Sequence, residues 1–140
     1  MNDEHIRRIL ETAKTIATVG FSASPEKPSH RVPKYLMQHG YRVIPVNPTA
    51  TEILGQKAYP SLLSVPEKVD VVEIFRPSAD VPPIVEQAIK LGAAVVWMQE
   101  GIVNHEAAAK AEAAGLQVVM DRCMKKEHRR LIESLPDERE

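Results

Sequence analysis

Five short runs rich in valine and isoleucine recur along the 140-residue chain, and each is followed by polar residues, glycine or proline. Apolar residues fill nearly every position of these runs instead of alternating with polar ones, which is typical of parallel strands buried on both faces. We therefore predict five buried strands. They span Thr15–Gly20, Tyr41–Asn47, Val69–Phe75, Ala93–Gln99 and Leu116–Asp121.

The segments between these runs carry apolar residues three and four positions apart among Ala, Leu, Glu and Lys, a pattern that predicts helices. The predicted helices span Glu4–Thr12, Ser29–His39, Val81–Leu91, Asn104–Ala114 and about Lys125–Leu135. The link after the second strand is broken by prolines into short pieces but still has to cross over. Regular alternation predicts an α/β fold, namely a single doubly wound Rossmann-like domain over residues 1–140 with a five-stranded parallel sheet in the order 3-2-1-4-5.

Charge and cysteine content narrow the class of protein. The chain has 18 Lys and Arg against 19 Asp and Glu, so its overall charge favours neither a nucleic-acid nor a membrane partner. Its single cysteine, Cys123, and the lack of an apolar run that could span a bilayer indicate a cytoplasmic protein. The histidines show no spacing typical of metal ligands, so no metal site is expected.

The turn after the first strand is the leading candidate for an anion site. Ligands of doubly wound folds bind beyond the carboxyl ends of the strands, and Gly20 lets the backbone approach a phosphate there. The dinucleotide pattern G-x-G-x-x-G is absent, however, because Ala23, Ser24 and Pro25 follow instead of further glycines. The second strand ends in Asn47, where an NAD site would have an acidic residue. The pattern therefore disfavours NAD.

A nucleotide with an additional phosphate would explain the missing acidic residue. Lys27, Arg31 and Arg76 are the cationic candidates for phosphate contacts at this edge, although Arg76 could instead pair with Asp80 or Glu73. These residues by themselves leave both NADP and CoA open as ligands.

Several motifs together carry a resemblance to a known family. They are Val19-Gly20-Phe21-Ser22, Lys27-Pro28-Ser29, Gly40-Tyr41, Pro45-Val46-Asn47-Pro48, and Asp121-Arg122-Cys123 with Glu127-His128. The set resembles the small stand-alone CoA-binding proteins over nearly the whole chain. Their order is also similar to that in the N-terminal CoA-binding domain of the succinyl-CoA synthetase α subunit, which has Thr-Glu-Gly where this chain has Gln99-Glu100-Gly101.

The resemblance implies coenzyme A as the cofactor and assigns roles along the cleft. Six residues would wrap the diphosphate, namely Gly20, Phe21, Ser22, Ala23, Ser24 and Pro25. Asn47 and Pro48 would flank the adenosine, and Arg76, Pro77, Gln99, Glu100 and Gly101 would line the next part. The synthetase subunit has a phosphate-binding lysine where this chain has Ala50, and Lys27 or Arg31 would compensate. Ligase activity is not implied, because the second domain with the phosphorylated histidine has no counterpart here.

Two further classes of function stay open at this point. An NADP-linked or CoA-handling enzyme would have to use Cys123 with His128, although the usual role of a lone cysteine after a buried strand is packing. A non-binding interaction subunit is the third class. A protein partner or a homo-oligomer is compatible with each of them. The sequence favours a protein that binds CoA or acyl-CoA and has no catalytic activity of its own.

Overall fold

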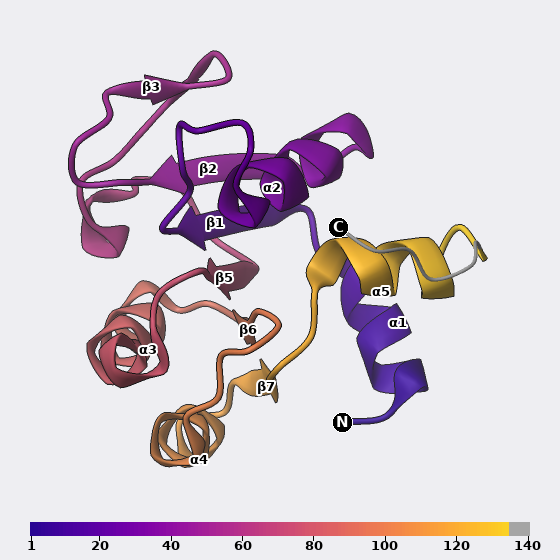
Figure 1. Ribbon diagram of the computed structural model, residues 1–140. Helices are drawn as coiled ribbons and strands as arrows, with labels where there is room; N and C mark the ends of the chain where they lie inside the picture. The colour runs from indigo at the N-terminus through magenta and orange to yellow at the C-terminus, as the bar shows by residue number, and fades with distance from the viewer. Residues whose placement is uncertain (135–140) are drawn as a thin grey trace.

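The computed structural model describes residues 1–134 and has an α/β architecture of three layers (Figure 1). The main sheet contains β1 (Thr15–Val19), β2 (Arg42–Val46), β5 (Val71–Ile74), β6 (Val95–Met98) and β7 (Gln117–Val119), and all neighbouring strands in it are parallel. The helices are α1 (Asp3–Thr12), α2 (Pro28–Gln38), α3 (Val81–Leu91), α4 (His105–Ala113) and α5 (Met124–Leu131). The five predicted strands and five predicted helices are confirmed, and the predicted end of the last helix at Leu135 lies outside the described residues.

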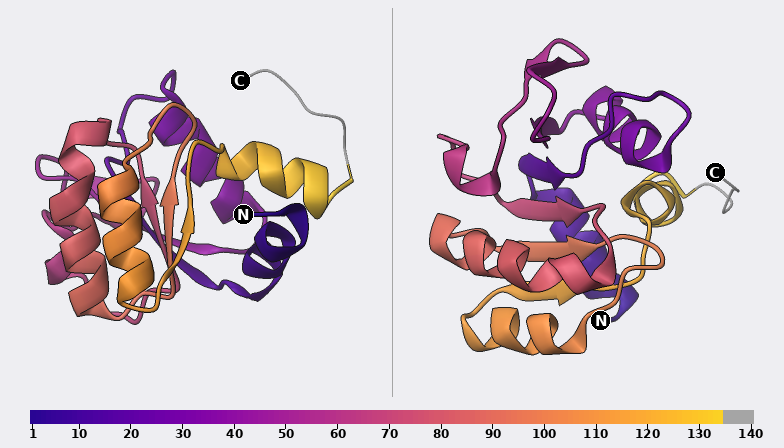
Figure 2. Two further views of the ribbon diagram at one scale, coloured as in Figure 1. Left: turned by 90° about the horizontal axis from the view of Figure 1, so that it is seen from below. Right: turned by 60° about the vertical axis from the view of Figure 1, so that its left-hand side comes forward.

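Each face of the sheet packs against its own set of helices (Figure 2). Helices α3 and α4 cover one face with small and β-branched side chains such as Val85 and Ala111. Helices α1, α2 and α5 cover the other, where Trp97 is the largest buried side chain. Successive strand residues point to opposite faces of the sheet, and helices cover both faces. Nearly all strand residues are therefore buried, which explains their continuous apolar pattern.

The strand order differs from the predicted one. The sheet runs β2-β1-β5-β6-β7, which is 2-1-3-4-5 when its five strands are counted along the chain, whereas 3-2-1-4-5 was predicted. The outer edge of β2 is occupied by the linking segment, since Tyr59 N–H donates to the Pro45 carbonyl (3.0 Å) and Asn47 N–H donates to the Tyr59 carbonyl (2.9 Å). Strand β5 therefore pairs with β1 on its other side, and the strand order reverses between these two strands.

The link between β2 and β5 forms a small hairpin and a short turn of helix. Strands β3 (Glu52–Ile53) and β4 (Gln56–Lys57) pair in an antiparallel hairpin that projects from the sheet in Figure 1. A 3-10 helix at Leu62–Ser64 follows, and Leu62 packs into the core beneath α3. These elements match the short pieces into which the prolines divide the sequence.

A buried polar network crosses the centre of the sheet on the face that carries α2 and α5. The Glu73 carboxylate on β5 accepts hydrogen bonds from Thr18 Oγ1 on β1 (2.7 Å) and from Gln99 Nε2 after β6 (2.9 Å). Gln99 Oε1 in turn accepts the backbone N–H of Met124 at the start of α5 (3.2 Å). Burial raises the pKa of Glu73 to about 7, although the Thr18 hydrogen bond acts in the opposite direction.

Glu73 should make the stability of the protein depend on pH. Its folded-state pKa is raised above the ordinary value of 4.5, so its contribution is fully present below pH 4.5 and is lost as the pH rises to about 7. The loss should approach about 3 kcal/mol, since one pKa unit corresponds to about 1.4 kcal/mol. Glu73→Gln should remove this dependence, measured by urea unfolding between pH 4 and pH 8.

The exposed substitution Glu11→Gln controls for the loss of one negative charge. A difference in unfolding free energy between the wild type and Glu73→Gln that stays constant over this pH range would contradict the prediction.

Candidate functional site

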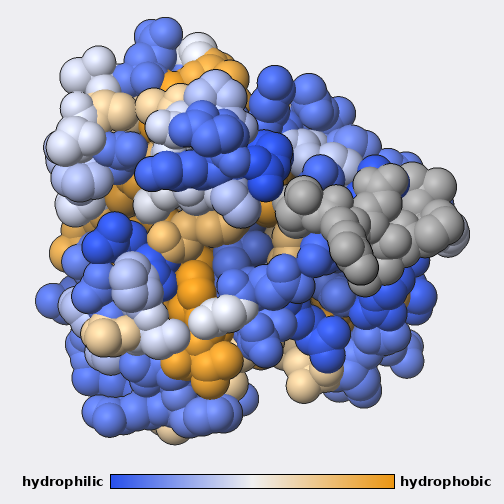
Figure 3. Space-filling model, viewed as in Figure 1, coloured by the Kyte–Doolittle hydropathy of each residue, from blue (hydrophilic) through white to orange (hydrophobic). Residues whose placement is uncertain are grey.

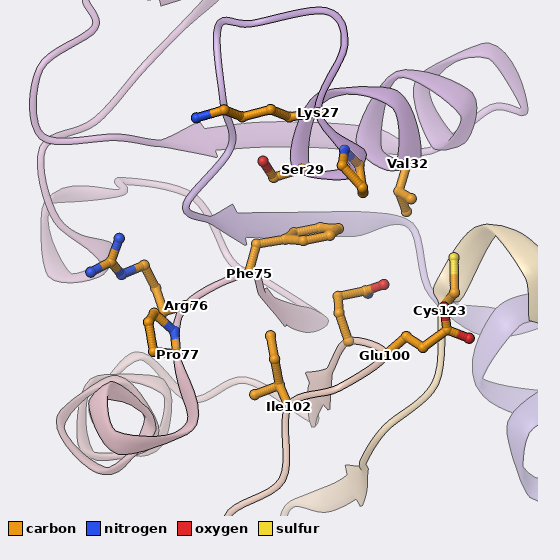
Figure 4. A pocket seen from close by; sticks show the side chains of 11 residues that line it. Lys27, Ser29, Val32, Phe75, Arg76, Pro77, Glu100, Ile102 and Cys123 are labelled. Atoms are coloured by element: carbon orange, nitrogen blue, oxygen red, sulfur yellow. The ribbon is translucent and has the colours of Figure 1, made fainter. Parts of the chain in front are cut away.

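A cleft opens at the carboxyl edge of the sheet where the strand order reverses. It consists of two cavities, which we call the outer and inner halves. Four residues line both of them and form what we call the waist, namely Lys27, Ser29, Phe75 and Arg76. The outer half, of about 700 Å³, is also lined by residues of the Gly20 turn, the end of β2 and α3. The inner half, of about 430 Å³, extends towards the start of α5 (Figure 4). Both volumes are in the range of small-molecule sites.

Gly20 ends β1 at a point where no side chain fits. Its φ of +88° lies in the left-handed region, and a Cβ atom there would be 2.8 Å from the carbonyl oxygen of Phe75. The Gly20 turn and the segment after β5 therefore run in direct contact before they diverge. Ser22 and Arg76 come to line the same outer half as a result.

The turn after Gly20 is held in one conformation by α2. His30 Nδ1–H donates to the Ser22 carbonyl (2.8 Å), and the Ser22 N–H donates to the Ser29 carbonyl (3.1 Å). Phe21 is completely buried and packs edge-on against His30, so only its backbone can take part in a site. The turn is thus preorganised before any ligand arrives.

Backbone donors are available in this turn and at the start of α2. Among residues 1–134, the backbone N–H groups of Ala23 and Ser29 donate to no protein acceptor. Ser29 is in the first turn of α2, where N–H groups lack partners within the helix and the helix dipole is positive. Of the two residues, Ser29 lines the outer half, so an anion there would find the Ser29 N–H beside the Ser29 hydroxyl.

Asn47 joins the end of β2 to the Gly20 turn. Its Nδ2 donates to the Phe21 carbonyl (2.9 Å), and its Oδ1 accepts the N–H groups of Thr49 and Ala50 (2.9 and 3.0 Å). Asn47 and Pro48 both line the outer half. The asparagine therefore shapes the cleft through both ends of its amide, and an aspartate could not make the contact to Phe21.

Of the three cationic candidates, Lys27 and Arg76 lie at the waist. Arg76 pairs with Asp80 (2.9 Å), one of the two acidic partners considered from the sequence, and the pair is exposed. Arg31 instead donates to the carbonyl of Glu26 and lines neither half. Lys27 and Arg76 thus both line the centre of the cleft, and the Asp80 carboxylate that pairs with Arg76 lines the outer half beside them.

The segment after β6 forms the floor of the inner half. Gln99 is buried and held by Glu73 and Met124, while Glu100 lies at the rim and pairs with Lys126 (3.1 Å). Gly101 lines neither half, and its N–H donates to Asp121 Oδ1 (2.7 Å). This contact ties the loops after β6 and β7 together.

Cys123 and His128 belong to different surroundings. Cys123 lines the inner half just before α5, whereas the buried His128 has its Nδ1 2.8 Å from the Tyr35 hydroxyl and contacts the rings of the exposed His39 and the half-buried Tyr41. Cys123 has extended backbone and precedes α5, whereas His128 lies within that helix. Burial lowers the pKa of His128. The arrangement gives no support to a Cys/His pair.

The structure brings together most of the residues that the sequence singled out, and it adds others. Six of them line the outer half or the waist, namely Gly20, Ser22, Lys27, Asn47, Pro48 and Arg76. Ala23, Ser24 and Pro25 lie in the turn but line neither half. Val32 and Ile102 are the lining residues that the sequence did not single out, and Ser29 and Phe75 were given no role in the site. Phe75 and Ile102 closely follow strands, where the rule on carboxyl ends places ligands.

Comparison with known proteins identifies the family. Residues 14–129 match the family described as "CoA binding domain". The chain is 42% identical over 123 residues to the uncharacterised protein YneT of Bacillus subtilis, covering 88% of this chain and 91% of that protein. A solved structure of a hypothetical protein from Pyrococcus horikoshii is 51% identical, with a TM-score of 0.91 over 94% of this chain and 93% of that one.

A second kind of relative is much longer. ADP-forming acetate–CoA ligase II of Archaeoglobus fulgidus is 36% identical over 87 residues, which are 61% of this chain but only 13% of the ligase. The chain belongs to the CoA-binding domain family, as its resemblance to the small CoA-binding proteins implied. Within the described residues, no helix is both long enough and apolar enough to cross a membrane.

Substitution of Gly20 should destabilise the fold and deform the cleft. Gly20→Ala adds a Cβ against the Phe75 carbonyl as well as left-handed strain, so we expect a loss of about 2–4 kcal/mol in the free energy of unfolding. Gly40→Ala is the matched control, because Gly40 has a φ of +93° but an added Cβ would have open space within 4 Å among the described residues. It should lose only about 1 kcal/mol. Equal losses in denaturant titrations would refute the close contact.

Proposed function

We propose that this chain is a single-domain module that binds CoA, or a CoA thioester, in the cleft at the carboxyl edge of its sheet. The observation that carries the proposal is the waist, where Lys27 and Arg76 line the cleft together with Ser29, whose backbone N–H lies in the first turn of α2. Membership of the CoA-binding domain family supports the same ligand. The diphosphate of CoA is the part that matches this concentration of donors and positive charge.

The adenosine half of CoA fits the outer half of the cleft. Asn47 and Pro48 form one wall there, and Ser61 and Leu62 of the linking segment also line it. None of these side chains is acidic, so a 3′-phosphate on the ribose would not meet a carboxylate from β2. Asp80 also lines the outer half, but its carboxylate is paired with Arg76. The pantetheine arm would then pass the waist and enter the inner half.

Binding without catalysis is the function that we propose for the isolated chain. Cys123 lines the cleft, but His128, the base that the sequence offered for a thiol nucleophile, is engaged with the Tyr35 hydroxyl. The matched region is a small part of the acetate–CoA ligase relative, and we infer that the chain acts as a carrier, sensor or regulatory partner.

Isothermal titration with CoA, dephospho-CoA, AMP and NADP tests the proposal. CoA should bind most tightly, because only CoA combines the 3′-phosphate with an arm that extends through both halves of the cleft. Lys27→Ala and Arg76→Ala should each weaken CoA binding about tenfold, as expected for the loss of one charge-assisted contact.

Lys34→Ala is the matched control, since Lys34 is an exposed residue of α2 that lines neither half. Its affinity for CoA should equal that of the wild type. Tighter binding of NADP than of CoA, or equal binding of AMP and CoA, would overturn the assignment.

A further inference from the structure

The inner half of the cleft differs from the outer half in its chemistry. Phe75 of the waist forms part of its wall, and most of the wall beyond the waist is apolar, namely Pro28, Val32, Pro77, Ile102 and Cys123. Figure 4 shows Phe75 between α2 and Ile102, with the charged ends of Lys27 and Arg76 on the opposite side from Cys123. Apolar surface is also visible within the hollow on this face of the molecule (Figure 3). The cleft therefore passes from a cationic waist into an apolar chamber.

The chamber is held open by contacts that do not involve a ligand. Ile102 N–H donates to the Gln99 carbonyl (2.9 Å), and the loop is tied to Asp121 through Gly101. On the side of α5, Trp97 Nε1 donates to the Arg122 carbonyl (2.8 Å), directly before Cys123. Since these contacts hold the loop after β6 and the start of α5 in place, the chamber can accept an apolar group without first rearranging.

We propose that the inner half seats the acyl group of a short, uncharged CoA thioester, an inference that rests on the proposed function. With the diphosphate at the waist, the sulfur end of the pantetheine arm points into this chamber. Free CoA would leave apolar walls in contact with water, whereas an acyl chain would cover them. Each methylene buried in this way stabilises the complex.

Acyl groups that end in a carboxylate are disfavoured by the same chamber. Beyond the waist, Glu100 is the only charged residue among those that line the inner half in the described part of the chain. Its positive partner Lys126 is already engaged at 3.1 Å. A second carboxylate would lose water among Val32, Phe75 and Ile102 and would face the negative charge of Glu100. The chamber thus selects by charge as well as by the apolar area that the acyl group covers.

Calorimetric titration with CoA, acetyl-CoA, butyryl-CoA and succinyl-CoA tests this selectivity. Affinity should rise about two- to fourfold for each added methylene, so butyryl-CoA should bind about tenfold more tightly than acetyl-CoA. Succinyl-CoA should bind at least about tenfold more weakly than butyryl-CoA. Equal affinities for CoA and butyryl-CoA, or succinyl-CoA binding as tightly as butyryl-CoA, would overturn the inference but leave CoA binding intact. Failure of all four to bind would instead overturn the proposed function.

A substitution in the wall tests whether the chamber holds the acyl group. Ile102→Trp fills the chamber and should reduce the ratio of butyryl-CoA affinity to CoA affinity to about one. Its matched control is Val103→Trp, at an exposed neighbouring position that lines neither half, which should keep the wild-type ratio. An unchanged ratio in Ile102→Trp would contradict the assignment of the chamber.

Glu100→Gln tests the charge and does not depend on whether Ile102→Trp folds. It should raise the affinity for succinyl-CoA about fivefold relative to butyryl-CoA, whereas Glu106→Gln on the exposed surface of α4 should not. A ratio that stays the same in Glu100→Gln would show that Glu100 does not select against acidic acyl groups.

Discussion

The contact between Gly20 and the Phe75 carbonyl is the constraint on which the cleft depends. The two residues directly follow β1 and β5, which are neighbours in the sheet, and the chain then leaves towards α2 on one face and α3 on the other. A side chain at Gly20 would force the two segments apart. Their close contact brings Ser22, Ser29 and Arg76 to a common opening, where donors from one segment and a cation from the other can act on one anion.

Below this opening, the sheet carries a polar network instead of a wholly apolar core. Glu73 connects Thr18 to Gln99, and Gln99 connects β6 to the first residue of α5. These hydrogen bonds place the start of α5, and with it Cys123, at the inner end of the cleft. Burying this carboxylate costs free energy, because its ionised form is poorly solvated there. It nevertheless couples three strands and a helix directly beneath the site.

The difference between the two halves of the cleft follows from which elements wall them. The outer half lies against turns and the linking segment, where backbone groups and polar side chains are exposed. The inner half lies between α2 and the face of the sheet that carries Trp97, so its walls continue the hydrophobic core. A ligand with a polar nucleotide at one end and an apolar arm at the other matches this gradient along its whole length.

Continuous apolar runs and helical spacings determined the five strands, the five helices and the parallel sheet, because these patterns follow from burial within a few residues. The family motifs located the turn at Gly20 and the end of β2, because each motif is a run of only a few neighbouring residues.

The strand order was decided by pairing between distant segments. Pro45 was the one local signal, since a proline in a strand favours an edge, and β2 is indeed beside the linking segment at the edge of the sheet. Tertiary packing also decided which loop residues face the cleft. Phe21 packs inward against His30, and Arg31 points away to the Glu26 carbonyl. The space around each side chain depends on elements far away in the sequence.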